Sequence, residues 1–258
     1  MAVFRARAVA VATGVPALFA LAAGLLTVSA TNPTASAAES AAVPVLVQAP
    51  FAVTRPGKRI GYRPIPITHR VSTSEPVAFI TIDDGVVKDT KGLAYVEEQE
   101  LPITAFLSTW TVKDRAGYFE RLTAWGSIQN HSATHSSFAD ATTDLGHEIC
   151  YSQRALRKSF GERAWMLRPP YGQGADAFGT AVMSQRCDIT EIVMWDATVS
   201  DGRARFASGK LRPGSIVLLH FTSDLARDLK AAVAEIRKAG LTPANLADYL
   251  PRSDVPLS

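Results

Sequence analysis

The sequence feature that most constrains the fold is an apolar run, 77–82, that ends directly in Asp83, Asp84 and Gly85. Six consecutive apolar or β-branched residues are typical of a strand that is buried on both faces of a parallel sheet. Successive side chains of a strand point to opposite faces, so two adjacent acids at its end can take different roles in one cleft. Without partners elsewhere in the chain, the same residues would fit a strand followed by an ordinary Asp-Gly turn.

The chain beyond this run alternates short apolar segments with helical patterns. Strands are expected at 103–107, 127–130, 164–167, 189–195 and 215–219, and helices at 92–99, 115–125, 144–160, 175–186 and 226–239. This alternation indicates an α/β fold with a parallel sheet, whose functional residues gather at the carboxyl ends of the strands. We predict an incomplete or distorted (β/α) barrel of about seven strands rather than an open doubly wound sheet.

The N-terminal residues 1–37 have the features of a signal peptide. Arg5 and Arg7 precede an apolar run from 8 to 30, and small residues follow this run. We expect cleavage after Ala37, with an earlier small-residue site as the alternative. The other interpretation is an uncleaved membrane anchor, because the run is long enough to cross a bilayer. In both cases the remainder of the chain is expected outside the cytoplasm.

The remainder of the chain divides into two regions. Residues 38–74 are rich in Ala, Pro, Ser and Arg without periodicity, which predicts a linker and an extended, irregular lead-in. Residues 75–251 contain the alternating pattern and are expected to form one domain. With 47% hydrophobic residues, the 258-residue chain can bury a substantial core. The net charge of +3 gives no indication of a nucleic-acid partner.

Cys150 and Cys187 are the only two cysteines. In an exported chain they can form a disulfide between neighbouring helices, and buried free thiols are the alternative. Neither cysteine lies at the end of a predicted strand beside a histidine, which argues against a catalytic thiol.

Two of the five histidines, His131 and His135, follow the third predicted strand. If this turn is helical, their spacing places both imidazoles on one side, where they can bind the same ion. The spacing alone is a weak signal. A carboxylate from the pair Asp83 and Asp84 would complete a set of two histidines and one acid with open positions, which is typical of a catalytic metal site.

Two further segments end predicted strands at the same edge of the sheet. Arg168 precedes two prolines and Tyr171, in a stiff turn that can hold the guanidinium beside a carboxylate. The backbone N–H of Tyr171 can face a developing oxyanion. His220 follows the strand predicted at 215–219 and is suited to act as a general acid. A rigid surface turn and a satisfied core histidine are the simpler interpretations of these residues.

Together these motifs resemble those of the polysaccharide deacetylases, the carbohydrate esterase family four type with a NodB homology domain. The resemblance runs in order through most of the chain and implies that 75–251 is the catalytic domain. It implies a bound divalent metal, with Zn²⁺ expected, held by Asp84, His131 and His135. The catalytic residues that it implies are Asp83 as general base, His220 as general acid, Arg168 beside the base, Tyr171 in the oxyanion hole, and Asp201.

The fourth motif of the family is the poorest match. Asp201 aligns with an acid of that motif and would orient Arg168, but Gly202 stands where the family usually has a tryptophan. A proline common after the first motif is Val86 here, and an acid common after the last histidine is Phe221. These departures bear on substrate preference and rate more than on the metal site.

The resemblance implies removal of acetyl groups, chiefly N-acetyl groups, from an extracellular or cell-wall polysaccharide. Peptidoglycan, a chitin-like glycan and acetylated xylan are the expected substrates. The protein is expected to be secreted or associated with the cell wall without stable membrane insertion, or to be membrane-anchored if the signal is not cleaved. Two alternatives stay open: a non-catalytic, metal-containing protein that binds wall glycans, and another metal hydrolase that uses the same site.

Overall fold

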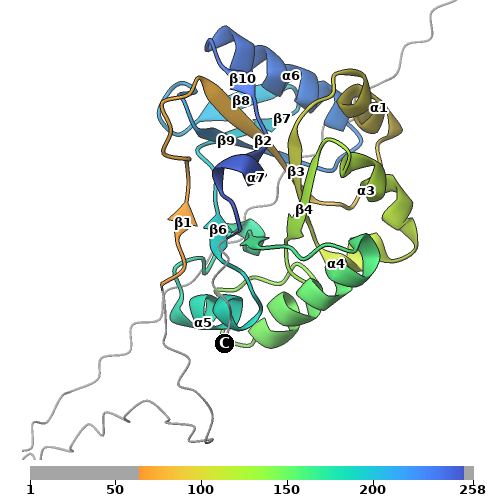
Figure 1. The fold of residues 1–258 in the computed structure, drawn as a ribbon, viewed down its shortest axis with the longest axis vertical. Helices are drawn as coiled ribbons and strands as arrows, with labels where there is room; N and C mark the ends of the chain where they lie inside the picture. The colour runs from red at the N-terminus through yellow and green to blue at the C-terminus, as the bar shows by residue number, and fades with distance from the viewer. Residues whose placement is uncertain (1–63, 253–258) are drawn as a thin grey trace, which may run out of the picture. The chain divides into compact units, whose positions relative to one another are not determined.

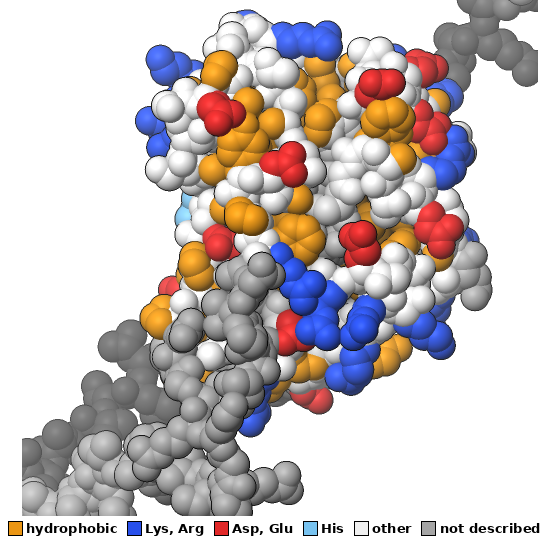
Figure 2. Space-filling model, in the orientation of Figure 1, with side chains coloured by type: hydrophobic (Ala, Val, Ile, Leu, Met, Phe, Trp, Pro, Cys, Tyr) orange, Lys and Arg blue, Asp and Glu red, His pale blue; other side chains and the backbone are white. Residues whose placement is uncertain are grey.

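The computed structural model describes residues 64–252; Figure 1 shows how their elements are arranged, and Figure 2 shows the side chains on the same face. The predicted signal peptide at 1–37 and most of the predicted lead-in at 38–74 lie outside the described residues. Within 64–252, no helix is both long enough and apolar enough to cross a membrane.

One curled sheet organises the domain. Its hydrogen-bonded order is β1-β6-β5-β4-β3-β2-β9-β7-β8, and β10 pairs with β2 beside this path. The strands are β1 (Ile67–Thr68), β2 (Val77–Asp84), β3 (Ile103–Leu107), β4 (Gly126–Asn130), β5 (Met166–Leu167), β6 (Glu191–Val193), β7 (Ala197–Ser200), β8 (Arg203–Phe206), β9 (Ser215–His220) and β10 (Thr242–Pro243). The pairings between these strands are parallel except that of β7 with β8.

The barrel is incomplete, because the edge strands β1 and β8 do not pair with each other in the part of the chain that the structure describes. This confirms the predicted incomplete (β/α) barrel. The sheet has ten strands where about seven were expected. Four of the ten strands lie outside the ranges expected for strands from the sequence: β1 and β10, which have two residues each, and β7 and β8, which form a hairpin.

Helices surround the curled sheet, and most of them cover its outside, while the last one packs Leu246 against the cluster that contains Phe79 (Figure 1). They are α1 (Thr90–Glu98), α2 (Thr109–Val112), α3 (Ala116–Leu122), α4 (Ser152–Phe160), α5 (Phe178–Arg186), α6 (Leu225–Lys238) and α7 (Leu246–Tyr249), together with the 3₁₀-helices η1 (Lys113–Arg115) and η3 (Pro170–Gly172) and the π-helix η2 (Gly146–Tyr151). The helix predicted at 144–160 is therefore two segments, η2 followed by α4.

The alternation of side chains along β2 separates two cores. Ala78, Ile80 and Ile82 belong to the larger cluster, which lies between the sheet and the outer helices. Phe79 belongs to a smaller cluster inside the barrel. By the same alternation Asp83 shares the interior face with Phe79, so β2 delivers the first of its two acids into the barrel.

Cys150 and Cys187 form a disulfide, with their Cα atoms 5.1 Å apart. The bond joins η2 to the residue that follows α5. Of the two states left open by the sequence, the structure therefore has the disulfide rather than the free thiols. The segment between the two cysteines includes β5 and the turn that follows it.

The double variant Cys150→Ser/Cys187→Ser should lose about 2–4 kcal/mol of unfolding free energy, because its unfolded chain is no longer cross-linked. The disulfide closes a loop over a sequence separation of 37 residues. Urea unfolding measures the loss. A reducing agent should destabilise the wild type similarly and leave the double variant unchanged, whereas equal stability of the oxidised wild type and the variant would contradict the prediction.

Candidate metal centre and active site

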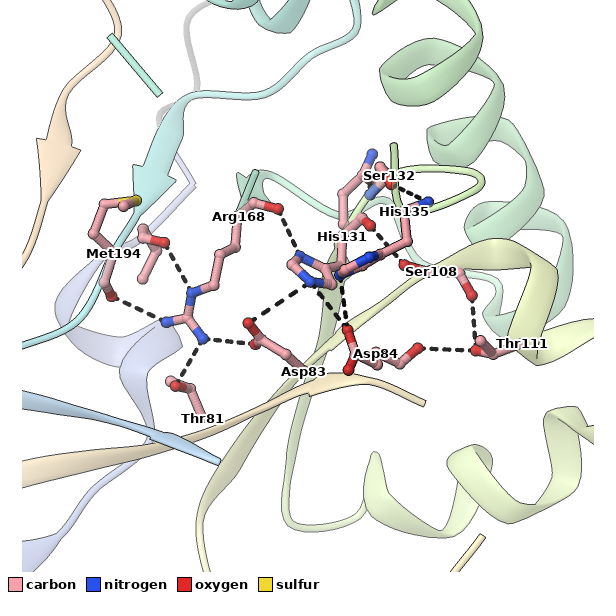
Figure 3. A network of polar contacts seen from close by, with 12 residues as sticks. Thr81, Asp83, Asp84, Ser108, Thr111, His131, Ser132, His135, Arg168 and Met194 are labelled. Carbon is pink, nitrogen blue, oxygen red and sulfur yellow. Dashed lines mark hydrogen bonds and ion pairs between the residues drawn. The ribbon is translucent and has the colours of Figure 1, made fainter. Parts of the chain in front are cut away.

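The candidate site residues lie at the carboxyl ends of neighbouring parallel strands. β2 ends in Asp83 and Asp84, and the register between β2 and β9 pairs Asp83 with His220. His131 directly follows β4, and Arg168 directly follows β5. Because β5, β4, β3, β2 and β9 are consecutive in the sheet, residues far apart in the sequence meet at one edge (Figure 3).

Asp84, His131 and His135 form a group that could hold a metal ion. Each offers one ligand atom, and these atoms lie within 4.8 Å of one another. Asp84 Oδ1 lies 3.3 Å from His131 Nε2 and 3.1 Å from His135 Nε2. This Oδ1 atom is buried and has no hydrogen-bond partner among the described residues. Two imidazole nitrogens around an unsatisfied carboxylate oxygen fit a divalent cation such as Zn²⁺.

The backbone sets the orientation of His131. Its Nδ1 lies 2.7 Å from the carbonyl oxygen of Arg168, which can only accept a hydrogen bond, so Nδ1 carries a proton. In the neutral ring the Nε2 lone pair then faces Asp84 and is free to bind a metal. Burial lowers the pKa of His131, but the carboxylates of Asp83 and Asp84 outweigh burial and raise it.

The same charges act on Asp84. Burial raises the pKa of this carboxyl, but the imidazoles of His131 and His135 outweigh burial and lower it. The carboxylates of Asp83 and Asp84 therefore favour a proton or a metal cation between the acids and the histidines. A bound cation would take the place of the proton.

The turn that carries both histidines is not helical, so the condition attached to their spacing is not met. Ser132 and His135 have positive φ values of 74° and 67°. With these two residues in the left-handed conformation, both imidazoles lie beside Asp84. Local hydrogen bonds hold the turn: Asn130 Oδ1 accepts from the Ser132 N–H at 2.8 Å, and Ser132 Oγ accepts from the His135 N–H at 2.9 Å.

Arg168 is completely buried, with 0% of its surface exposed. Its Nη1 donates to Asp83 Oδ1 at 2.7 Å and to Thr81 Oγ1 at 2.9 Å. Its Nε donates to the Val193 carbonyl and its Nη2 to the Met194 carbonyl, both at 3.0 Å (Figure 3). Burial lowers the pKa of Arg168 and Asp83 opposes that change, so the guanidinium remains charged and fixes the Asp83 carboxylate in one orientation.

Tyr171 and His220 border the same edge of the sheet and are accessible. Tyr171 has a φ of 59°, and its backbone N–H donates no hydrogen bond within the described residues. Its ring is edge-on to that of His135, with 4.6 Å between ring centroids. His220 is exposed at the end of β9. An unpaired amide beside the candidate metal centre and an exposed imidazole fit an oxyanion donor and a proton donor.

The structure corrects the role predicted for Asp201. Its carboxylate lies 3.2 Å from Arg227, its side chain is 80% exposed, and it makes no contact with Arg168 among the residues described. Asp201 and Gly202 have φ values of 54° and 69° and form the turn of the β7–β8 hairpin. Asp-Gly is a preferred pair for such a turn. A tryptophan in place of Gly202 would be strained in this left-handed conformation.

Sequence reasoning missed several residues that support the site. Thr81 could have been found, because strand alternation places it on the same face as Asp83. Phe106 lies on β3, and its ring centroid is 4.2 Å from the Arg168 guanidinium carbon. Glu148 accepts hydrogen bonds from the turn that carries the histidines. No sequence signal identifies Glu148, because its partners are two backbone amides and one hydroxyl of a different segment.

Comparison with known proteins assigns this architecture to one family. The family model described as polysaccharide deacetylase matches residues 70–186. An uncharacterized protein of Streptomyces coelicolor is 35% identical over 205 residues, covering 74% of this chain and 79% of its own. A chitooligosaccharide deacetylase of Sinorhizobium fredii is 29% identical over 163 residues, covering 58% and 74%. The solved structure of a CE4 family pseudoenzyme from Bacillus anthracis shares the fold, with a TM-score of 0.60 at 17% identity over 72% of this chain and 69% of that one.

Two arginine–aspartate pairs, one buried and one exposed, test the importance of Arg168. Arg168→Met should lower the unfolding free energy by about 3–5 kcal/mol, because Asp83 would remain buried without its partner. Arg227→Met removes exposed pairs with Asp201 and Asp224 and a longer contact of 3.9 Å with Asp228, and it should cost about 1 kcal/mol or less, because the Arg227 side chain is half exposed. Chemical unfolding of both variants measures the difference, and equal losses would show that the buried pair has no special structural role.

Proposed function

The chain belongs to the polysaccharide deacetylase family, and from this premise we propose that it is a metal-dependent hydrolase that removes acetyl groups from a polysaccharide. One observation carries the proposal: Asp83, oriented by Arg168, lies beside the metal-binding group of Asp84, His131 and His135. A positioned carboxylate next to a cation site is suited to the hydrolysis of amides and esters. The name of the Sinorhizobium fredii relative supports the same reaction class.

Asp84, His131 and His135 would hold the cation, and Zn²⁺ suits this set of ligands. When bound, the ion would polarise an acetyl carbonyl and lower the pKa of water at the site. His131 is prepared for this role by the hydrogen bond from its Nδ1 to the Arg168 carbonyl.

Asp83 would accept the proton of the attacking water. Its Oδ1 is occupied by Arg168 at 2.7 Å, while Oδ2 is directed toward the metal-binding group and lies 3.8 Å from His131 Nε2. One oxygen of the carboxylate thus binds Arg168, and the other is free to accept a proton. Arg168 contributes by positioning the base rather than by contacting the substrate.

The Tyr171 N–H would donate a hydrogen bond to the oxyanion that forms when water adds to the acetyl carbonyl. His220 would protonate the departing amine of an N-acetylated sugar, or the alkoxide of an O-acetylated one. Acetate and the free amine or hydroxyl are the products. The exposure of Tyr171 and of His220 is consistent with a polymeric substrate.

The proposed substrate is an acetylated glycan outside the cytoplasm, with N-acetyl groups as the first choice. The relative named for chitooligosaccharide deacetylation favours a chitin-like glycan, and acetylated xylan and peptidoglycan are the other candidates. The proposed location is the cell wall or the surrounding medium, because the N-terminal sequence has the features of an export signal.

A second function is favoured by one specific observation. Gly202 stands at the position where the family usually has a tryptophan, and it lies in a hairpin turn. A protein that holds a metal and binds wall glycans without releasing acetate is the corresponding alternative. It shares the metal-binding residues with the deacetylase and differs in turnover alone.

Acetate release from a panel of acetylated glycans separates the two functions. We expect the purified protein to release acetate from at least one of N-acetylated chitooligosaccharide, peptidoglycan and acetylated xylan. A chelator should abolish this activity and added Zn²⁺ should restore it, because the ion supplies the Lewis acid. Metal and glycan binding without acetate release would instead support the binding protein.

Asp83→Asn should reduce turnover by about 10²–10⁴-fold, since an amide cannot accept the proton of the attacking water. Asp201→Asn is the matched control and should leave turnover within about twofold, because its side chain is exposed in a hairpin turn. Zinc binding and thermal unfolding of both variants show whether each site is intact. An Asp83→Asn protein that releases acetate at the wild-type rate would refute the assignment of the base.

A further inference from the structure

We propose that Glu148 is a positioning residue that sets the metal affinity of the site by holding the turn between His131 and His135. This inference deepens the proposed function and rests on its metal site. Glu148 belongs to the π-helix η2, whereas Arg168 follows β5, so the two residues reach the segment that carries the histidines from different elements. It does not contact any of the three proposed ligands through its own side chain within the described residues.

Three hydrogen bonds join Glu148 to this turn. Its Oε2 accepts from the Ala133 N–H at 3.1 Å and from the Thr134 N–H at 2.9 Å. Its Oε1 accepts from the Thr134 hydroxyl at 2.7 Å. The carboxylate therefore binds the two central residues of the segment 131–135, whose first and last residues are the proposed ligands.

This turn needs an external support because its backbone conformation is unfavourable. Ser132 and His135 are not glycines, yet both have left-handed φ values. Such a residue costs on the order of 1–3 kcal/mol and persists only where the surroundings impose it. Without Glu148 the N–H groups of Ala133 and Thr134 would lose their acceptor, and the turn could relax away from Asp84.

Charge and burial make Glu148 a strong acceptor. The residue is only 4% exposed. Burial raises the pKa of its carboxyl, but hydrogen bonds from Thr134, Ser132 and His147 together outweigh burial and lower it, so the group is ionised at neutral pH. Hydrogen bonds to an ionised carboxylate are roughly twice as strong as those between neutral groups.

The element that carries Glu148 is itself fixed. η2 is a π-helical segment, a rare geometry that occurs often at functional sites. Asn130 Nδ2 donates to the Ile149 carbonyl at 3.2 Å, and the disulfide fastens Cys150 to Cys187. Glu148 thus presents its carboxylate from a rigid base, as a residue that supports a metal ligand requires.

Asp228 provides a matched control. It is also a carboxylate that is 4% exposed, and it accepts from the backbone N–H of Gly202 at 2.7 Å. It supports the β7–β8 hairpin turn rather than the metal-binding group. Removing Asp228 should therefore lower stability without changing metal affinity, which separates a general structural role from a role in positioning ligands.

The test measures Zn²⁺ binding to the apoprotein by competition with a chromophoric chelator, and the visible absorption of the Co²⁺-loaded protein. Glu148→Ala should weaken Zn²⁺ binding about 10–100-fold and change the Co²⁺ spectrum, as is typical when support of a metal ligand is lost. Glu148→Gln should stay within about threefold of wild type, because its amide oxygen can still accept from both backbone N–H groups. Asp228→Ala should bind Zn²⁺ as the wild type does. Thermal unfolding of each apoprotein reports stability separately.

A folded Glu148→Ala protein with wild-type Zn²⁺ affinity and an unchanged Co²⁺ spectrum would overturn the inference and leave the proposed function intact. A wild-type protein that binds no divalent cation would overturn both. If Glu148→Ala does not fold, Glu148→Asp shortens the side chain by one methylene and should weaken Zn²⁺ binding to a smaller degree. Equal losses of affinity in Glu148→Ala and Asp228→Ala would reduce Glu148 to a general contributor to stability.

Discussion

The site depends on the buried ion pair between Arg168 and Asp83. Removing a guanidinium and a carboxylate from water costs several kcal/mol for each ion, and attraction repays that cost only where the hydrogen bonds are well made. Here the guanidinium also donates to the Val193 and Met194 carbonyls at the end of β6, while the backbone carbonyl of Arg168 accepts from His131. A single residue therefore orients the proposed base through its side chain and a proposed metal ligand through its backbone.

Two supports act on the metal-binding group from different sides. Arg168 acts from inside the barrel, and Glu148 acts from the π-helix that packs outside it. Between them, His131 and His135 are held in a turn that would be unfavourable in isolation. The arrangement follows a general pattern, in which residues that touch no ligand determine how accurately the ligands are placed.

Strand periodicity predicted the central part of this architecture because β2 is buried on both faces, and burial leaves a clear apolar signal that ends at the acids. The histidine pair was identified as well, but its spacing suggested a helical turn, whereas side-chain hydrogen bonds to the backbone impose left-handed residues. Asp201 shows the opposite error. Alignment to a family motif assigned it a catalytic role, while the Asp-Gly pair was a direct local signal for the hairpin turn that it forms. Glu148 could not be predicted, since two of its partners are backbone amides, which nearly every residue type provides.

The site residues are far apart in the sequence, so the site forms only when the whole domain folds. Asp83 and Arg168 are separated by 85 residues, and His220, which pairs in register with Asp83, lies near the other end of the described chain. Such contacts require long loops to close, so no local segment of the chain can form the site by itself. An ion that binds it would be linked to the cooperative folding equilibrium of the entire sheet, and occupancy would protect segments far from the ligands against unfolding and proteolysis.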